Sequence, residues 1–252
     1  MYWRGKVKTI FICFLIQGNK YYFSKEYLRE DKEKNMGSQW TRDAVYRKSV
    51  KEGFRARSAY KLLDINTRFN IIRRTDNVVD LGSAPGSWLQ VLRTLTDGQL
   101  CGVDLNPIAP LEGIITFMGD FTTLEIQEKI RAAMPSVNVV VCDAAPHLSG
   151  AKAYDQARVM ALNESALNFA ASLLKQGGNL VMKSFQGTDF NDLVDLVKEK
   201  FYSVRVIRSV ATRRGSTECY IVAKNFIGDA RDDRIPVVRV KKEDGDVEGA
   251  DK

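Results

Sequence analysis

A predicted strand, a glycine-containing loop and a helix start follow one another in the segment VVDLGSAPGSW, residues 78–88. The apolar residues indicate a buried strand, and Gly82 and Gly86 enclose a tight turn before the helical pattern begins. In a doubly wound sheet ligands bind at such a turn, because glycine lets the backbone approach closely and the helix start presents unpaired amides. The segment therefore predicts an α/β fold with a ligand at this turn, and a plain strand-to-helix connection is the alternative.

The loop differs from the GxGxxG pattern of dinucleotide-binding proteins, because Ala84 and Pro85 stand where a glycine and a free amide are needed. A nicotinamide dehydrogenase is therefore disfavoured. Asp104 ends the next predicted strand, where a carboxylate can accept hydrogen bonds from both hydroxyls of a ribose. Asp120 follows the third predicted strand and is placed to bind an adenine amino group or an adjacent backbone amide. Each acid alone could cap a turn or a helix, but acids at successive strand ends favour a nucleoside cofactor over capping.

Short apolar runs alternate with helical patterns from residue 77 onward, which is typical of a parallel sheet covered by helices on both faces. The predicted strands are residues 77–81, 99–104, 114–118, 137–142, 179–183, 204–208 and 218–223. The predicted helices are residues 87–95, 123–133, 155–174 and 189–200. We expect a single domain over residues 37–226, preceded by an accessory or mis-started extension at 1–36 and followed by a flexible charged tail at 227–252.

The composition fits a folded, soluble chain, since 44% of the 252 residues are hydrophobic and 27% are charged. This length excludes a small scaffold that depends on disulfides or a structural metal. The four cysteines are scattered and only one histidine is present, so we expect no metal site and a reducing, cytoplasmic compartment. The longest apolar run, residues 10–16, is too short to span a bilayer, and we expect neither secretion nor a membrane partner.

Positive charge is concentrated in residues 39–75, where ten lysines and arginines stand against three acids. This excess equals the net charge of +7 of the whole chain. Aromatic residues are interleaved with the cations, which is the combination expected for phosphate contacts and base stacking on RNA. An amphipathic helix with a solvated basic face over residues 41–61 is a compatible structural interpretation. The RNA-binding candidates are Arg42, Arg47, Lys48, Lys51, Arg55 and Arg57, with Arg73, Arg74, Arg213 and Arg214 as further phosphate contacts.

Seven segments, in the same order along the chain, resemble the FtsJ-like ribose methyltransferases over about residues 42–226. They are RARSAYKLLDI (55–65), VVDLGSAPGSW (78–88), GVDLNP (102–107), GDF (119–121), CDAAPHLSG (142–150), VMKSFQG (181–187) and STECYIVA (216–223). The resemblance implies a Rossmann-like fold with a mostly parallel seven-stranded sheet, helices on both faces and an antiparallel last strand. It also implies S-adenosylmethionine as the cofactor and methyl transfer to the 2′-hydroxyl of a ribose in RNA.

The resemblance also implies which residues form the site. The catalytic set then falls on Lys61, Asp143, Lys183 and Glu218. The implied cofactor contacts are Gly86, Trp88, Asp104, Asp120 and Asp143, to which the loop itself adds Gly82 and Pro85.

Elementary chemistry favours the same four catalytic candidates. Asp143 and Lys183 are expected to end the two strands that adjoin the first, and Glu218 begins the last, so all can face one cleft at the carboxyl edge of the sheet. A ribose hydroxyl is a weak nucleophile, and Lys183 can serve as its base if burial and the neighbouring Lys61 destabilise the ammonium form. Asp143 and Glu218 oppose that destabilisation and fix the position of the amine. The sequence leaves open which influence is stronger.

Other functions stay open at this point. A non-catalytic RNA-binding or ribosome-assembly factor would share the fold, although the intact catalytic set argues against it. A small-molecule or protein methyltransferase would not explain the basic segment. Within RNA, the compact chain favours a uridine of large-subunit ribosomal RNA as the target, with transfer RNA and an mRNA cap as alternatives. We expect a monomer.

Overall fold

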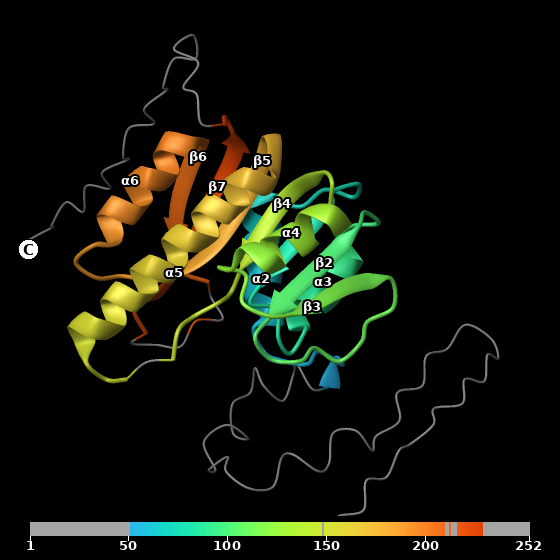
Figure 1. Ribbon diagram of the computed structural model, residues 1–252, viewed down its shortest axis with the longest axis horizontal. Coiled ribbons are helices and arrows are strands. Elements are labelled where there is room, and N and C mark those ends of the chain that lie inside the picture. The colour runs from blue at the N-terminus through green and yellow to red at the C-terminus, as the bar shows by residue number, and fades with distance from the viewer. Residues whose placement is uncertain (1–50, 148, 210–211, 213–215, 229–252) are drawn as a thin grey trace, which may run out of the picture. The chain divides into compact units, whose positions relative to one another are not determined.

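A computed structural model describes residues 51–147, 149–209, 212 and 216–228, which form one seven-stranded sheet with helices on both faces (Figure 1). The strands are β1 (Val78–Leu81), β2 (Leu100–Asp104), β3 (Ile114–Met118), β4 (Val137–Cys142), β5 (Leu174–Phe185), β6 (Phe201–Ile207) and β7 (Glu218–Phe226). Their order across the sheet is β3-β2-β1-β4-β5-β7-β6. All pairings are parallel except those of β7 with β5 and β6. The predicted Rossmann-like sheet with an antiparallel last strand is therefore confirmed.

Two helix layers bury the two faces of the sheet. The helices are α2 (Ala59–Phe69), α3 (Ser87–Leu95), α4 (Leu124–Ala133), α5 (Lys152–Leu173) and α6 (Phe190–Lys200). Val79 and Leu81 of β1 pack in the core under α4, α5 and α6, whereas Val78 packs under α2 and α3. Both faces of β1 are thus covered, which explains why this strand is apolar at three of its four positions and buried throughout.

The alternation of side chains along each strand decides which polar groups lie on the α2 side. Val181 of β5 and Val222 of β7 belong to the core under α2 and α3. Side chains two residues apart on a strand share a face, so Lys183 and Tyr220 also lie on this side. Asp80 shares it with Val78 for the same reason. The sheet thus directs several polar groups toward the helix that carries Lys61.

Three sequence predictions need correction. Lys183 lies on β5, which pairs with β4 and β7, so the expectation that its strand adjoins β1 is wrong; β2 and β4 occupy both edges of β1. β5 begins at Leu174 rather than at residue 179, because α5 ends at Leu173 and leads directly into it. The predicted helix over residues 41–61 is interrupted in its described part, since the chain turns at Gly53 (φ 79°) and a separate helix begins at Ala59.

Three of the four cysteines, Cys101, Cys142 and Cys219, are buried free thiols, whereas Cys13 lies outside the described residues. Burial raises the pKa of each of these three thiols to about 12, so they stay protonated at neutral pH. Within the described ranges, no cluster of three or more histidine, cysteine and acidic side chains is arranged to hold a metal ion. None of the described helices has the length and apolar composition needed to cross a membrane.

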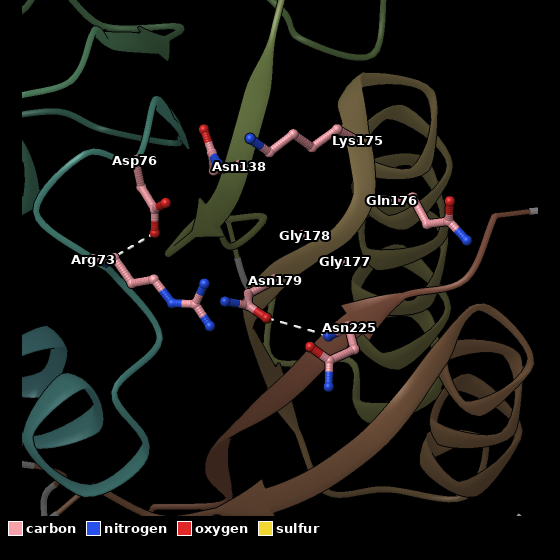
Figure 2. A pocket seen from close by; sticks show the side chains of 9 residues that line it. All are labelled: Arg73, Asp76, Asn138, Lys175, Gln176, Gly177, Gly178, Asn179 and Asn225. Atoms are coloured by element: carbon pink, nitrogen blue, oxygen red, sulfur yellow. Dashed lines mark hydrogen bonds between the residues drawn. The ribbon is translucent and has the colours of Figure 1, made fainter.

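Amide side chains join the loops at the amino ends of the parallel strands. Asn179 Nδ2 donates to the carbonyl of Ile71 (2.8 Å), and Asn179 Oδ1 accepts from the backbone N–H of Asn225 (3.2 Å). Asn138 Oδ1 accepts from the backbone N–H of Asn77 (3.0 Å). A polar pocket of about 300 Å³, shown in Figure 2, is lined here by the amino ends of β4 and β5, the last turn of chain before β1 and the end of β7. The pocket lies at the edge opposite to the predicted catalytic residues, and its amides hold the fold together there.

We predict that Asn179→Ala lowers the free energy of unfolding by about 2 kcal/mol, because it leaves a buried carbonyl and a backbone N–H without their partner. Urea unfolding of the two proteins measures this difference. The matched control is Gln176→Ala, since Gln176 lines the same pocket but is exposed. Its effect should stay within about 0.5 kcal/mol. Equal effects of the two substitutions would contradict the assigned role.

Candidate active site

The four predicted catalytic residues come together at the carboxyl edge of the sheet. Asp143 directly follows β4, and Lys183 lies near the end of β5. Because β7 runs antiparallel to β5, its first residue, Glu218, reaches the same edge and stands opposite Phe185. Lys61 arrives from the first turns of α2, on the face that Lys183 shares. Residues from four elements thus meet in one place.

The four side chains form two nearly buried ion pairs. Lys61 Nζ donates to Glu218 Oε1 at 2.5 Å, and the two side chains are 9% and 13% exposed. Lys183 Nζ lies 3.3 Å from Asp143 Oδ1 and donates to the backbone carbonyl of Asp143 at 2.9 Å. The second pair is 13% and 16% exposed. Charges this deeply buried are stable only when paired, so each lysine is held in place by its carboxylate.

Tyr220 connects the two pairs and was missed by the sequence analysis. Its hydroxyl donates to Asp143 Oδ1 (2.8 Å), and Lys61 Nζ lies 5.8 Å from the centre of its ring. Burial, and then the negative charges of Asp143 and Glu218, raise the pKa of Tyr220 well above its ordinary value, so the phenol remains a hydrogen-bond donor. The available signal was its place two residues after Glu218, which predicts the same face of the strand.

The predicted glycine loop is a tight cradle beside these pairs. Gly82 (φ 77°) and Gly86 (φ 99°) adopt left-handed backbone conformations that favour glycine. A Cβ atom on Gly82 would lie 2.6 Å from Ala144 Cβ, and one on Gly86 would lie 2.6 Å from an Arg55 guanidinium nitrogen. The backbone N–H of Gly82 donates to the carbonyl of Val103 (2.8 Å), which holds the loop against the end of β2. Only glycine fits at these two positions.

Two buried polar side chains, Asp80 near the end of β1 and Ser83 in the loop, have no hydrogen-bond partner among the described residues. Both carboxylate oxygens of Asp80 and the hydroxyl of Ser83 are fully covered and unpartnered. Burial, followed by the charges of Asp143 and Asp104, raises the pKa of Asp80 well above its ordinary value. A buried polar group without a partner is costly, and such groups in a native fold call for a physical reason. Their position beside the loop fits a site that a polar ligand or water completes.

Asp104 and Asp120, predicted to contact the cofactor, both accept hydrogen bonds from backbone N–H groups of the protein itself. Asp104 Oδ2 accepts from the N–H of Ala84 (3.0 Å) and Oδ1 accepts from the N–H of Asn106 (2.8 Å). Asp120 Oδ1 accepts from the N–H (2.9 Å) and the hydroxyl (2.8 Å) of Thr122. The turn-stabilising role that the sequence analysis ranked lower is therefore present at both positions.

Apolar side chains accompany these acids at the ends of β2 and β3. Leu105, which follows Asp104, and Met118, which pairs with Asp104 across the two strands, are each 69% exposed. Carboxylates beside exposed apolar surface suit a nucleoside, because its base is largely apolar and its ribose donates hydrogen bonds. The side chain of Trp88 lies in the core under α2, where its indole N–H donates to the carbonyl of Ser58 (2.8 Å). Its backbone belongs to the first turn of α3, directly after the glycine loop.

The predicted RNA-binding residues fall into two groups. Arg42, Arg47, Lys48, Arg213 and Arg214 lie outside the described residues. Among the others, Lys51 and Arg73 are exposed, Arg57 is half-buried, and Arg74 forms an exposed ion pair with Asp97 (2.6 Å). Arg55 is half-buried and donates to backbone carbonyls of the protein itself. Lys51 and Arg73 are therefore accessible to RNA, whereas the guanidinium of Arg55 is already bound within the protein.

Comparison with known proteins finds one family and close relatives. Residues 54–226 match the family model of FtsJ-like methyltransferases. A Methanocorpusculum labreanum protein named ribosomal RNA large subunit methyltransferase E is 81% identical over 199 residues, covering 79% of this chain and 98% of that one. A Methanosphaerula palustris protein of the same name is 59% identical over 197 residues, covering 78% and 97%.

A solved structure supports the fold alone. It comes from Plasmodium falciparum and is described as a ribosomal RNA methyltransferase. It has a TM-score of 0.63 and 24% sequence identity, and the match covers 69% of this chain and 100% of that one.

We predict that the free energy of unfolding of Asp80→Asn minus that of the wild type increases with pH, when both proteins are measured without cofactor. The raised pKa of Asp80 means that its stabilising contribution is complete below the unfolded value of 3.8 and is lost as the pH rises toward the folded value. Asparagine does not titrate, so the variant does not undergo this loss. Urea unfolding at several pH values between about 4 and 8 measures the difference. A difference that is constant with pH would contradict the buried-acid assignment.

Proposed function

The chain belongs to the FtsJ-like methyltransferase family, and on this basis we propose that it transfers a methyl group from S-adenosylmethionine to the 2′-hydroxyl of a ribose in large-subunit ribosomal RNA. One observation carries the proposal: the Lys183–Asp143 and Lys61–Glu218 pairs meet around Tyr220 beside a glycine loop. The relatives named ribosomal RNA large subunit methyltransferase E support the choice of RNA.

The chain's residues fit this cofactor. When bound, S-adenosylmethionine supplies an electrophilic methyl group on a positively charged sulfur. The cradle formed by Gly82 and Gly86 admits a ligand close to the backbone. Asp80 and Ser83 offer buried polar atoms that have no described partner, and exposed apolar surface stands beside Asp104. We assign cofactor binding to the predicted set, Gly82, Pro85, Gly86, Trp88, Asp104, Asp120 and Asp143, together with Asp80.

Lys183 is the base in this proposal. As a neutral amine, its Nζ accepts the proton of the ribose hydroxyl and becomes an ammonium. Asp143 stabilises that ammonium through Oδ1, 3.3 Å away, and through its backbone carbonyl, 2.9 Å away. The same contacts hold the amine in one position, which a reaction in line with the methyl group requires. The proton passes to solvent before the next turnover.

Lys61 and Glu218 act on the other side of the hydroxyl. The Lys61 ammonium, fixed by Glu218, stabilises the negative charge that develops on the ribose oxygen as its proton leaves. The site is largely shielded from water, so this charge interaction is stronger than it would be at an exposed surface. The pair thus orients the acceptor and lowers the barrier.

We predict that Lys183→Ala lowers methyl transfer to ribosomal RNA by about 10²–10⁴-fold at saturating cofactor, because the hydroxyl loses its base. Cofactor binding, measured by calorimetric titration, should persist. Transfer of a labelled methyl group is measured on isolated large-subunit ribosomal RNA. Digestion to nucleosides and mass spectrometry then locate the methyl group on the 2′-oxygen.

The matched control is Lys198→Ala, since Lys198 pairs with Asp195 at the surface of α6 and should leave transfer unchanged. Near-normal transfer by Lys183→Ala would show that Lys183 is not the base. A wild-type protein that binds no cofactor, or that methylates only transfer RNA, would overturn the proposed function itself.

We also predict that RNA binding weakens steeply with salt, by about 10³–10⁵-fold between 50 and 200 mM if six to ten phosphates are contacted. Lys51 is an exposed cation of the basic segment, so Lys51→Ala should reduce the slope of log affinity against log salt by about one. Filter binding at several salt concentrations measures both slopes, with Lys198→Ala again as the control. An affinity that does not change with salt would contradict the RNA surface.

A further inference from the structure

The guanidinium of Arg55, in the basic segment, donates its hydrogen bonds to the protein's own backbone. Arg55 Nη1 donates to the carbonyls of Pro85 (2.9 Å) and Ala109 (2.7 Å), and Nη2 donates to the carbonyl of Pro110 (3.1 Å). Hydrogen bonds from a charged donor are stronger than neutral ones, and the planar guanidinium holds its donors in a fixed fork. One side chain therefore binds two separate loops at once.

Both loops belong to the proposed cofactor site. Pro85 belongs to the glycine loop between β1 and α3, and Ala109 and Pro110 belong to the connection between β2 and β3. Asp104 ends β2, directly before that second connection, and already binds the glycine loop through Ala84 (3.0 Å). Arg55 adds a second bridge farther along both loops. The spacing between the two loops thus depends on this guanidinium.

Arg55 also lies directly under Gly86. A Cβ atom at Gly86 would meet Arg55 Nη1 at 2.6 Å and Ile108 at 3.3 Å, so the glycine, the guanidinium and the second loop are in close contact. Glycine at this position permits the approach of the arginine as well as its own backbone conformation (φ 99°). This packing fixes where the loop can lie.

The segment that carries Arg55 is itself fastened to α3. The N–H of Arg55 donates to Gln90 Oε1 (2.8 Å), and Gln90 Nε2 donates to the carbonyl of Gly53 (3.0 Å). The hydroxyls of Ser58 and Ser87 are 2.8 Å apart, and Trp88 donates to the carbonyl of Ser58 (2.8 Å). The backbone on both sides of Arg55, at Gly53 and at Ser58, is therefore held against α3.

We propose that Arg55 is a positioning residue that holds the glycine loop and the β2–β3 connection in the geometry that binds the cofactor, rather than a phosphate contact for RNA. This inference rests on the proposed function, because it concerns the same cofactor site. Three backbone carbonyls already accept hydrogen bonds from its guanidinium. A cation that the sequence predicted to contact RNA therefore supports the binding of S-adenosylmethionine instead.

The test compares Arg55→Ala and Arg55→Lys with wild type by calorimetric titration of S-adenosylmethionine and by RNA binding at several salt concentrations. We expect the cofactor Kd of both variants to rise about tenfold or more, since charge-assisted bonds between the two loops are lost. The cofactor KM should rise in parallel, whereas kcat at saturating cofactor and the salt slope of RNA binding should stay near those of wild type. Lysine keeps the charge but lacks the fork, so Arg55→Lys should not restore cofactor binding.

The matched control is Arg93→Ala. Arg93 also donates from its guanidinium to two backbone carbonyls, those of Thr96 and Gly98, but at the far end of α3 from the glycine loop. Its loss should lower thermal stability and leave the cofactor Kd within about twofold of wild type.

Two results would overturn the inference. One is a cofactor Kd within about twofold of wild type in folded Arg55→Ala or Arg55→Lys, whatever happens to RNA binding. The other is an equal rise in Kd for Arg93→Ala, which would indicate a general loss of structure. If Arg55→Ala does not fold, Arg55→Lys alone decides. Absence of cofactor binding by the wild-type protein would instead count against the proposed function.

Discussion

The ion pair between Lys61 and Glu218 joins α2 to β7 across 157 residues of sequence. Both side chains are nearly buried, and removing either partner would leave an uncompensated charge, a change that typically costs several kcal/mol. The pair therefore helps to fix the position of α2 against β7, together with the apolar contacts of Ala59, Leu62 and Ile65. The position of α2 in turn determines where the preceding segment lies, and with it the contacts of that segment with α3 and the glycine loop. The geometry of the whole carboxyl edge thus depends on this pair.

Polar groups gather at that edge although they weaken the fold there. Asp80 occupies a core position of β1 with a raised pKa and no described partner, where an apolar residue would pack at no such cost. Tyr220 and Lys183 also take positions on a face that is otherwise apolar. Perturbed and buried titratable groups of this kind are typical of catalytic sites, because proton transfer and recognition of a charged ligand need them. This arrangement therefore lowers the free energy of unfolding.

The sequence predicted the seven strands and the helices α3 to α6, because short apolar runs alternate with helical patterns along the chain. It did not predict a separate helix at α2, and β5 begins earlier than expected. It also predicted that Asp143, Lys183 and Glu218 would share one edge of the sheet, from the expected strand ends, and the family resemblance added Lys61. It did not predict strand order, which is decided by pairing between distant segments. Tyr220 was hidden as one more apolar residue of its strand. The partners of Arg55 lie 30 to 55 residues away in loops without periodicity, so local patterns contain no signal for them.

Residues 53–61 combine three contacts that the proposed reaction needs. Arg55 binds the loops of the cofactor site, Ser58 binds the start of α3, and Lys61 enters the catalytic cluster. Basic residues proposed to meet RNA lie in and immediately before the same stretch. One short stretch of chain therefore fixes the loops of the proposed cofactor site, the start of α3 and one of the two catalytic ion pairs.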